Sequence, residues 1–248
     1  MRKKNKVNLR NSCPNCSSNK YFSIYKSTVN FTNDLNTKIF SARRLPDKVH
    51  GTIVKCSKCG LVRTLEIVED TNLSKLYLNS LFTYKDLTDN LLKSYGKILQ
   101  SAALRLKSRK NFLEIGCGNG FMFKVARKIG FHGVYGVEPS DDAISKASKI
   151  DKKGIKQTIF KKGVFPKNTF DMICAFQVFD HIPDPNTFLK TCLDILNPGG
   201  ILVLMNHDVD SFSAKVLGEK SPIFDIEHTF LYSKRTIKAI LKKNDFLV

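Results

Sequence analysis

Two pairs of cysteines near the N-terminus have the spacing of a metal site. The pairs are Cys13-Pro-Asn-Cys16 and Cys56-Ser-Lys-Cys59, and Gly60 follows the second pair and suits a tight turn. Two intervening residues let both sulfur atoms of a pair face one point, and four thiolates form a closed tetrahedral site for structural zinc. A redox CxxC pair normally lies beside a βαβ pattern, and none surrounds these cysteines, so the spacing favours zinc.

The stretch between the two pairs is long for a compact zinc finger. The segments KYFSIYKS and GTIVKC within it read as strands, which fits a zinc ribbon. A module of this size has little core of its own, and zinc supplies roughly 10–16 kcal/mol of folding free energy in isolated fingers. We therefore expect residues 1–68 to form a zinc-ribbon-like module.

A glycine-rich loop follows the apolar run at residues 111–115. Its sequence is Gly116-Cys117-Gly118-Asn119-Gly120, so the third glycine comes one position earlier than in the dinucleotide pattern GxGxxG. Glu114 stands two residues before the first glycine. Its carboxylate would repel a phosphate and attract a cation, so the loop predicts a cationic ligand.

Strands and helices alternate from residue 110 onward. Strands are expected at 112–115, 133–138, 155–160, 170–175 and 201–205, with helices at 121–129, 141–150 and 233–243. This alternation predicts a parallel sheet with helices on both faces, and its ligands lie beyond the carboxyl ends of the strands. Residues 71–110 read as helical, either as a connection packed on the next domain or as a lid.

Four motifs in this region resemble those of the class I S-adenosylmethionine-dependent methyltransferases. LEIGCGNG resembles motif I, and GVEPS resembles the ribose-binding position at the end of the second strand. FDMI followed by QVFDHIPDP resembles motif IV and its tail, and LNPGG resembles the turn before strand five. The resemblance covers most of residues 110–205 and implies a Rossmann-like α/β sheet with helices on both faces.

The resemblance implies S-adenosyl-L-methionine as the cofactor. Glu114 would help to hold its amino group, usually through water, and Glu138 would accept hydrogen bonds from both ribose hydroxyls. The alternative for Cys117 is a small residue chosen for fit, and Cys174 and Cys192 are expected in the core. The implied cofactor-binding residues are Glu114, Gly116, Cys117, Gly118, Glu138, Pro139, Phe176 and Gln177.

The candidate proton acceptors are histidines. His181 follows strand four, where the acceptor pocket of the family begins, and His228 lies in a stretch that resembles EHLxxF of related glycan and sugar methyltransferases. His207 is a weaker candidate, and each histidine has a structural alternative. Some relatives bind a divalent metal through an ExxEH set. Here Gln177 replaces the first acid of that set, so we expect no catalytic metal.

The combination of a cysteine module with these motifs indicates which class of molecule accepts the methyl group. It resembles enzymes of deoxysugar and surface-polysaccharide pathways, which methylate carbon or oxygen of nucleotide-linked sugars or glycans. Zinc-containing rRNA methyltransferases are the alternative, and the net charge of +19 favours them. Their cysteine pairs lie closer together, so the long gap here favours a sugar or glycan acceptor over nucleic acid.

The segment order gives three expected regions. Residues 1–68 are the zinc-ribbon-like module, 69–109 a helical connection or lid, and 110–248 the cofactor-binding domain. The last two strands of the class I sheet are apparently missing after residues 246–248, so a truncated S-adenosylmethionine-binding domain with little activity is a further alternative. The sequence has no apolar run of membrane-spanning length and no signal-peptide pattern, which predicts a cytoplasmic protein without a membrane span.

Overall fold

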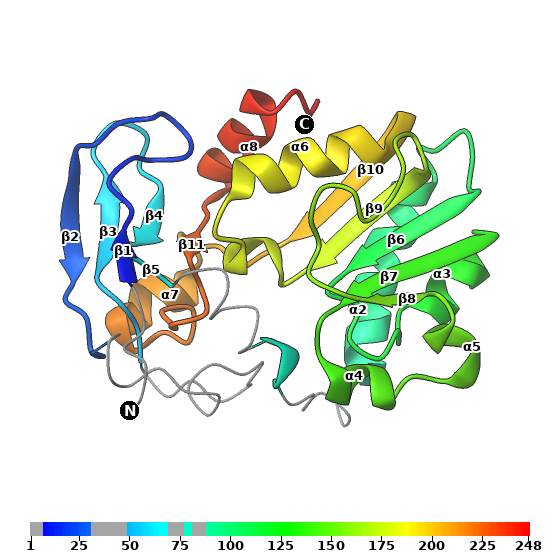
Figure 1. The fold of residues 1–248 in the computed structure, drawn as a ribbon. Coiled ribbons are helices and arrows are strands. Elements are labelled where there is room, and N and C mark those ends of the chain that lie inside the picture. Colours follow the sequence, from blue (N-terminus) through cyan, green and yellow to red (C-terminus); the bar gives the residue numbers. More distant parts are fainter. Residues whose placement is uncertain (1–6, 31–48, 69–76, 81–87) are drawn as a thin grey trace. The chain divides into compact units, whose positions relative to one another are not determined.

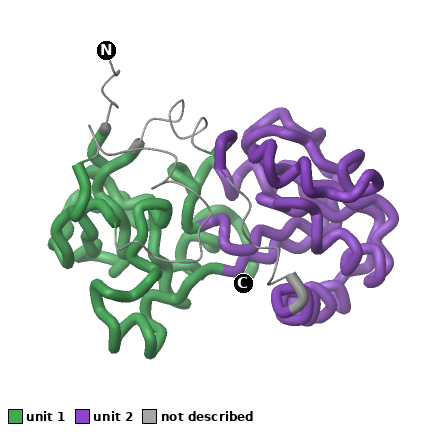
Figure 2. The backbone as a smooth tube through the Cα atoms, turned by 90° about the horizontal axis from the view of Figure 1, so that it is seen from below, with its two compact units in different colours: residues 1–77, 180–187, 206–248 green, residues 78–179, 188–205 purple. Residues whose placement is uncertain are grey.

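The computed structural model describes residues 7–30, 49–68, 77–80 and 88–248 (Figure 1). Its chain forms two compact units (Figure 2). Unit 1 contains residues 1–77, 180–187 and 206–248, and unit 2 contains residues 78–179 and 188–205. Residues 180–187 and 206–248, which the sequence placed with the cofactor-binding domain, are thus grouped with the cysteine module.

Unit 2 is built on a parallel sheet of five strands in the order β10-β9-β6-β7-β8. Its members are β6 (Asn111–Ile115), β7 (Gly133–Glu138), β8 (Ile155–Gln157), β9 (Phe170–Phe176) and β10 (Leu196–Met205). Every residue of β9 is buried, as expected for a central parallel strand covered on both faces. The five strands predicted from the sequence are all present, and the Rossmann-like arrangement is confirmed.

Helices flank this sheet on both faces, with α2 and α3 on one side and α6 on the other (Figure 1). Their bounds are α2 (Thr88–Ala103), α3 (Phe123–Ile129), α4 (Asp141–Ser145), α5 (Lys149–Lys152) and α6 (Pro185–Ile195), with the short 3₁₀ helix η2 (Phe179–His181) before α6. Residues 71–76 and 81–87 of the expected helical connection lie outside the described residues.

The single helix expected at 141–150 is two helices. The Ser140 hydroxyl caps α4 by accepting a hydrogen bond from the amide of Ala143. The Ser148 hydroxyl caps α5 in the same way, from the amide of Asp151. A second capping serine in extended backbone interrupts the helix, because a cap residue lies outside the helical φ/ψ region.

The described residues of unit 1 form two antiparallel sheets. The larger has the order β11-β4-β3-β2, formed by β2 (Tyr21–Tyr25), β3 (Ile53–Cys56), β4 (Val62–Thr64) and β11 (Phe230–Leu231). The smaller pairs β1 (Val7–Leu9) with β5 (Glu66–Val68). The two strands predicted from KYFSIYKS and GTIVKC are confirmed as β2 and β3, whereas β11 was not expected.

The remaining elements of unit 1 follow β10 in the chain. They are α7 (Phe212–Leu217), the 3₁₀ helix η3 (Gly218–Lys220) and α8 (Lys234–Lys243), which confirms the last predicted helix. Ser233 and Thr236 form a capping box at the start of α8. Residues 246–248 form no strand, and none of the helices in the described residues is long and apolar enough to cross a membrane.

Candidate functional site

The glycine loop runs directly from the carboxyl end of β6. Gly116, Gly118 and Gly120 have φ values of 71°, 55° and 74°, a region that glycine adopts readily and other residues rarely do. A Cβ atom on Gly116 would lie 2.5 Å from Cγ2 of Val178. Glycine is therefore required at this position both by the backbone and by the packing of the loop.

Glu114 is buried beneath this loop with 2% of its surface exposed. Its Oε2 atom has no hydrogen-bond partner in the described structure. Burial, and then the nearby carboxyl group of Glu138, raise the pKa of Glu114 well above its ordinary value. A buried acid without a cation is an unfavourable arrangement, and a bound ammonium group would relieve it.

Glu138 joins the end of β7 to the glycine loop. Its Oε2 atom accepts a hydrogen bond of 2.9 Å from the amide of Gly118, and its Oε1 atom accepts one of 2.8 Å from the amide of Ser140. Burial raises the pKa of Glu138, although these two amides oppose the shift. Each carboxylate oxygen keeps a second lone pair, so Glu138 can still accept hydrogen bonds from a ligand.

The other predicted cofactor residues have different surroundings. Pro139 is half-buried after β7. Phe176 stacks on Tyr95 of α2, with ring centroids 4.4 Å apart. Cys117 is fully buried, and a Cβ atom on Gly136 would lie 2.4 Å from its sulfur, so only the Cys117 backbone is placed to line a ligand.

Gln177 directly follows β9 and has a left-handed conformation with φ of 55°, which is uncommon for a residue with a side chain. Its side-chain Oε1 is buried and has no hydrogen-bond partner in the described structure, as is also true of Asn119 Oδ1 in the glycine loop. Together with Glu114 Oε2, these two atoms are the buried side-chain oxygens without a hydrogen-bond partner among the described residues of unit 2, and each can accept a hydrogen bond from a ligand. These atoms and the glycine cradle fit a cationic, hydrogen-bond-donating cofactor.

A second cluster lies within unit 1 and is centred on Asp180. Its Oδ2 atom is 3.3 Å from His207 Nδ1 and 3.9 Å from His228 Nε2, and its Oδ1 atom is 3.6 Å from His181 Nε2. The His228 ring centroid is 4.9 Å from those of both His181 and His207. The structure therefore brings together all three histidines that the sequence proposed as proton acceptors.

Asp180 is negatively charged in this cluster. Burial would raise the pKa of Asp180, but His181, His207 and His228 lower it to about 2, so the carboxylate is ionised at neutral pH. Burial lowers the pKa of His181 to about 4, although Asp180 opposes this, so His181 is neutral. The ligand atoms of Asp180, His181 and His228 lie within 4.8 Å of one another, a spacing that could also hold a metal ion.

Tyr77 and Glu227 lie near this cluster, and neither was proposed from the sequence as a site residue. Burial raises the pKa of Tyr77 well above its ordinary value, and the carboxylates of Glu227, Asp180 and Asp225 add to the effect. Glu227 is itself 8% exposed. Tyr77 follows Leu73 and Leu76 at helical spacing, so its sequence signal is that of an ordinary core residue.

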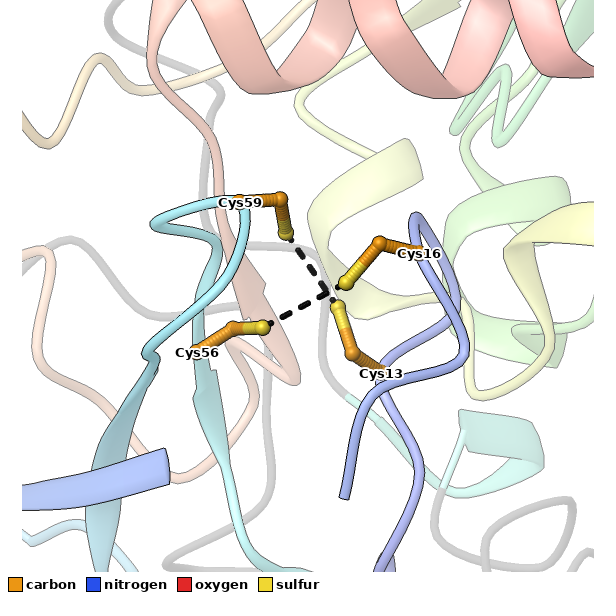
Figure 3. Close-up of side chains that lie close together, drawn as sticks. All are labelled: Cys13, Cys16, Cys56 and Cys59. Atoms are coloured by element: carbon orange, nitrogen blue, oxygen red, sulfur yellow. Dashed lines mark hydrogen bonds between the residues drawn. The ribbon is translucent and has the colours of Figure 1, made fainter. Parts of the chain in front are cut away.

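The four cysteines of the two pairs meet in unit 1 with their sulfur atoms turned toward one another (Figure 3). The Cys13 and Cys59 sulfurs are 3.4 Å apart, the Cys16 and Cys56 sulfurs are 3.5 Å apart, and all four lie within 4.8 Å. A tetrahedron with Zn–S bonds of about 2.3 Å has S–S edges of roughly 3.8 Å. The four thiols therefore fit zinc with small adjustments.

The surroundings of the cysteines agree with this fit. Gly60 has φ of 79°, as expected for the turn after the second pair. Burial would raise the pKa of Cys56, but the backbone amides of Cys59 and Lys58 lower it to about 6, whereas burial raises the pKa of Cys13 and of Cys59. Cys174 and Cys192 are fully buried elsewhere, as predicted.

Comparisons with known proteins agree with this geometry. The family described as a methyltransferase domain matches residues 88–248. The chain is 30% identical over 122 residues to the ubiquinone biosynthesis O-methyltransferase of Bradyrhizobium sp. (strain ORS 278), covering 47% of this chain and 48% of that protein. It is 25% identical over 150 residues to the protein of the same name from Shewanella sp. (strain ANA-3), covering 56% and 64%. The chain thus matches about half to two thirds of the length of these relatives.

A solved structure shows the same fold. The SAM-dependent methyltransferase from Archaeoglobus fulgidus superposes with a TM-score of 0.52 and 18% sequence identity, covering 63% of this chain and 69% of that protein.

Proposed function

Because the chain belongs to the family described as a methyltransferase domain, we propose that it transfers a methyl group from S-adenosylmethionine to a small-molecule or glycan acceptor. The observation that carries this proposal is the buried Glu114 carboxyl beneath a glycine loop, with no hydrogen-bond partner for one of its oxygens. A phosphate-binding loop would not place an acid there.

The cofactor would be held by residues of unit 2. Glu114 would bind its ammonium group, Glu138 its ribose hydroxyls, and the buried oxygen of Gln177 a further donor. Gly116, Gly118 and the backbone of Cys117 would let the cofactor approach the chain closely. When bound, S-adenosylmethionine supplies an electrophilic methyl group on a sulfonium. The protein has to position the acceptor and, for some acceptors, remove a proton.

The Asp180 cluster is suited to that proton removal. His228 Nδ1 donates a hydrogen bond of 2.8 Å to the carbonyl oxygen of Ile223, which leaves a lone pair on Nε2. When this nitrogen accepts the acceptor's proton, the resulting imidazolium faces the ionised Asp180 carboxylate 3.9 Å away. We propose His228 as the base and His181 as its neutral neighbour in the acceptor site.

The cysteine cluster would hold structural zinc. All four ligands come from the protein and no position is left for water or substrate, so the metal would not take part in the reaction. Cysteines that bind zinc instead of forming disulfides fit a reducing compartment, and we therefore propose a cytoplasmic location.

For the acceptor, we propose a nucleotide-linked sugar or a surface glycan, methylated on carbon or oxygen. The cysteine module beside a methyltransferase domain supports this choice. A hydroxyl group of an intermediate in ubiquinone biosynthesis is the second candidate, supported by the relatives named ubiquinone biosynthesis O-methyltransferase. Both acceptors need a proton removed, so the Asp180 cluster serves either.

Two measurements test the proposal. Calorimetric titration of the full chain with S-adenosylhomocysteine should give saturable binding of one ligand per chain, and the Glu114→Ala variant should bind much more weakly. Transfer of tritiated methyl from S-adenosylmethionine should then be followed with nucleotide-linked keto-sugars, hydroxylated intermediates of ubiquinone biosynthesis and rRNA. Label on the sugar supports the first acceptor class, label on the ubiquinone intermediate replaces it with the second, and label on rRNA overturns both. A folded, zinc-loaded chain that does not bind S-adenosylhomocysteine would refute the cofactor assignment.

A further inference from the structure

The second cysteine pair is the turn of a hairpin that leads to the histidine cluster. Cys56 is the last residue of β3, and β4 begins at Val62 after the turn. The Cys56 amide donates to the carbonyl of Leu61 at 2.9 Å, and the Gly60 amide donates to the carbonyl of Cys56 at 2.9 Å. The course of β4 is therefore set by the geometry of this cysteine turn.

Thr64 of strand β4 is hydrogen-bonded to the segment around His228. The amide of Thr64 donates to the carbonyl of Thr229 at 3.0 Å, and the Thr64 hydroxyl donates to the carbonyl of His228 at 3.1 Å. Thr64 is 3% exposed, so water does not compete for these bonds. Pairing of β4 with β11 continues the attachment beyond Thr229.

The same connection extends to His181. The Thr229 hydroxyl donates to the carbonyl of His181 at 3.3 Å. Thr64 therefore holds the carbonyls of His228 and Thr229. The side chain of Thr229 in turn holds the backbone of His181. Carbonyl orientation matters here because rotating a peptide plane changes the direction in which the adjoining side chain leaves the backbone.

The first cysteine pair holds the residues that follow His181. The carbonyl of Pro14, between Cys13 and Cys16, accepts a hydrogen bond of 3.2 Å from Asn186 Nδ2. The guanidinium of Arg10 donates to the carbonyl of Pro183. Each cysteine pair thus has a short connection to one of the two histidine segments.

We propose that the zinc module positions the proposed catalytic histidines, and that Thr64 is the positioning residue that connects the second cysteine pair to His228 and His181. This inference rests on the proposed function. It gives the cysteine module a role in acceptor activation that is separate from folding alone. We assign Thr64 no contact with cofactor or acceptor. It acts only through the orientation of the imidazole rings of His228 and His181.

The test is a Thr64→Val variant, which keeps the shape and the strand preference but removes the hydroxyl. The zinc-loaded full chain, labelled with ¹⁵N-histidine, is observed by long-range proton–nitrogen NMR, which distinguishes the two ring tautomers. With five histidines in the chain, each signal can be assigned by single substitution. We expect His228 of the wild type to carry its proton on Nδ1, as the Ile223 carbonyl requires.

In Thr64→Val we expect the His228 and His181 signals to move toward tautomer averaging, with zinc content and S-adenosylhomocysteine affinity unchanged. Thr64→Ser should restore the wild-type pattern. The matched control is Thr169→Val in unit 2, which also removes a threonine hydroxyl bonded to a carbonyl, that of Pro166 at 2.8 Å. Once an acceptor is known, kcat should fall on the order of 10-fold to 100-fold in Thr64→Val alone.

A Thr64→Val protein that keeps the wild-type histidine pattern would overturn the proposal. If this variant loses zinc or unfolds, Thr229→Val replaces it, because that change removes only the bond to His181. An unchanged His181 signal there is also contrary to the proposal. The NMR measurement needs no acceptor. A failed search for methyl transfer would therefore count against the proposed function, but it would not change the result on the positioning of the two histidines by Thr64.

Discussion

His228 Nδ1 lies 2.8 Å from the carbonyl oxygen of Ile223. A carbonyl oxygen can only accept a hydrogen bond, so the ring proton is on Nδ1 and the lone pair is on Nε2. The Nε2 atom lies 3.9 Å from Asp180 Oδ2. The tautomer that a base requires is thus set by the backbone before any acceptor arrives.

Replacing His228 should affect the reaction and leave the cofactor site unchanged. His228→Gln removes the base, and we expect methyl transfer to fall by about 10²-fold or more because general-base contributions have this size. Binding of S-adenosylhomocysteine to the residues of unit 2 should be unchanged. The matched control is His132→Gln, at an exposed histidine of unit 2. Equal loss in both variants would refute the role of His228.

The low pKa of His181 should make folding stability depend on pH. Its pKa is about 4 in the folded protein and about 6.5 in an unfolded chain. Between these values the unfolded state binds more protons, so lowering the pH through this window destabilises the fold. Between pH 7 and pH 4.5 the loss from this group is about 2 kcal/mol.

Urea unfolding at the two pH values checks this expectation. His181→Gln should reduce the difference in unfolding free energy between pH 7 and pH 4.5, while the exposed-site variant His132→Gln should leave it as in the wild type. An identical pH dependence in wild type and His181→Gln would contradict the neutral state of the half-buried His181.

Cofactor binding should release a proton from Glu114. Burial keeps the pKa of this carboxyl well above its ordinary value in the free protein. A bound ammonium group favours the carboxylate and lowers the pKa, so protons leave during binding. The calorimetric enthalpy for S-adenosylhomocysteine should therefore change with the ionisation enthalpy of the buffer.

Glu114→Gln supplies the control for that titration. The variant has no proton to release, so its binding enthalpy should be independent of the buffer, with weaker affinity. Buffer dependence that survives in Glu114→Gln would assign the proton to another group. The Glu138→Gln variant, which changes the neighbouring acid, tests that possibility first.

Metal analysis should find one zinc ion per chain. Cys16→Ser removes one of four converging sulfurs, and we expect both zinc content and folding stability to fall sharply, because metal binding and folding of such modules are coupled. Cys192→Ala, at a buried cysteine outside the cluster, should keep full zinc content. Far less than one zinc per wild-type chain would contradict the assignment.

The sequence predicts the sheet of unit 2 well because its signals are local. Most of its strands contain a short apolar run, and Gly130, in the left-handed conformation, caps the end of α3. The signal for the glycine loop is also local, because its positive φ values occur at glycine residues, which can be recognised in the sequence. The same holds for the four cysteines, whose spacing alone indicates that they meet.

Long-range arrangement is what the sequence leaves out. Asp180 appears in it only as part of a motif tail, and nothing local indicates that three histidines from separate segments surround it. Strand β11 has only two residues, too few for a periodic pattern, and it becomes a strand through pairing with β4. The grouping of residues 206–248 with the cysteine module depends on the same tertiary contacts.

Strand β11 also governs when unit 1 can be completed during synthesis. Its partner β4 leaves the ribosome long before residues 230–231 are made, so the four-stranded sheet is complete only after those residues. Pairing across such a sequence separation is slow because loop closure precedes the stabilising contacts. The proposed zinc site needs no such wait, and zinc bound there would keep the nascent hairpin ordered, with β4 still unpaired at one edge until residues 230–231 are made.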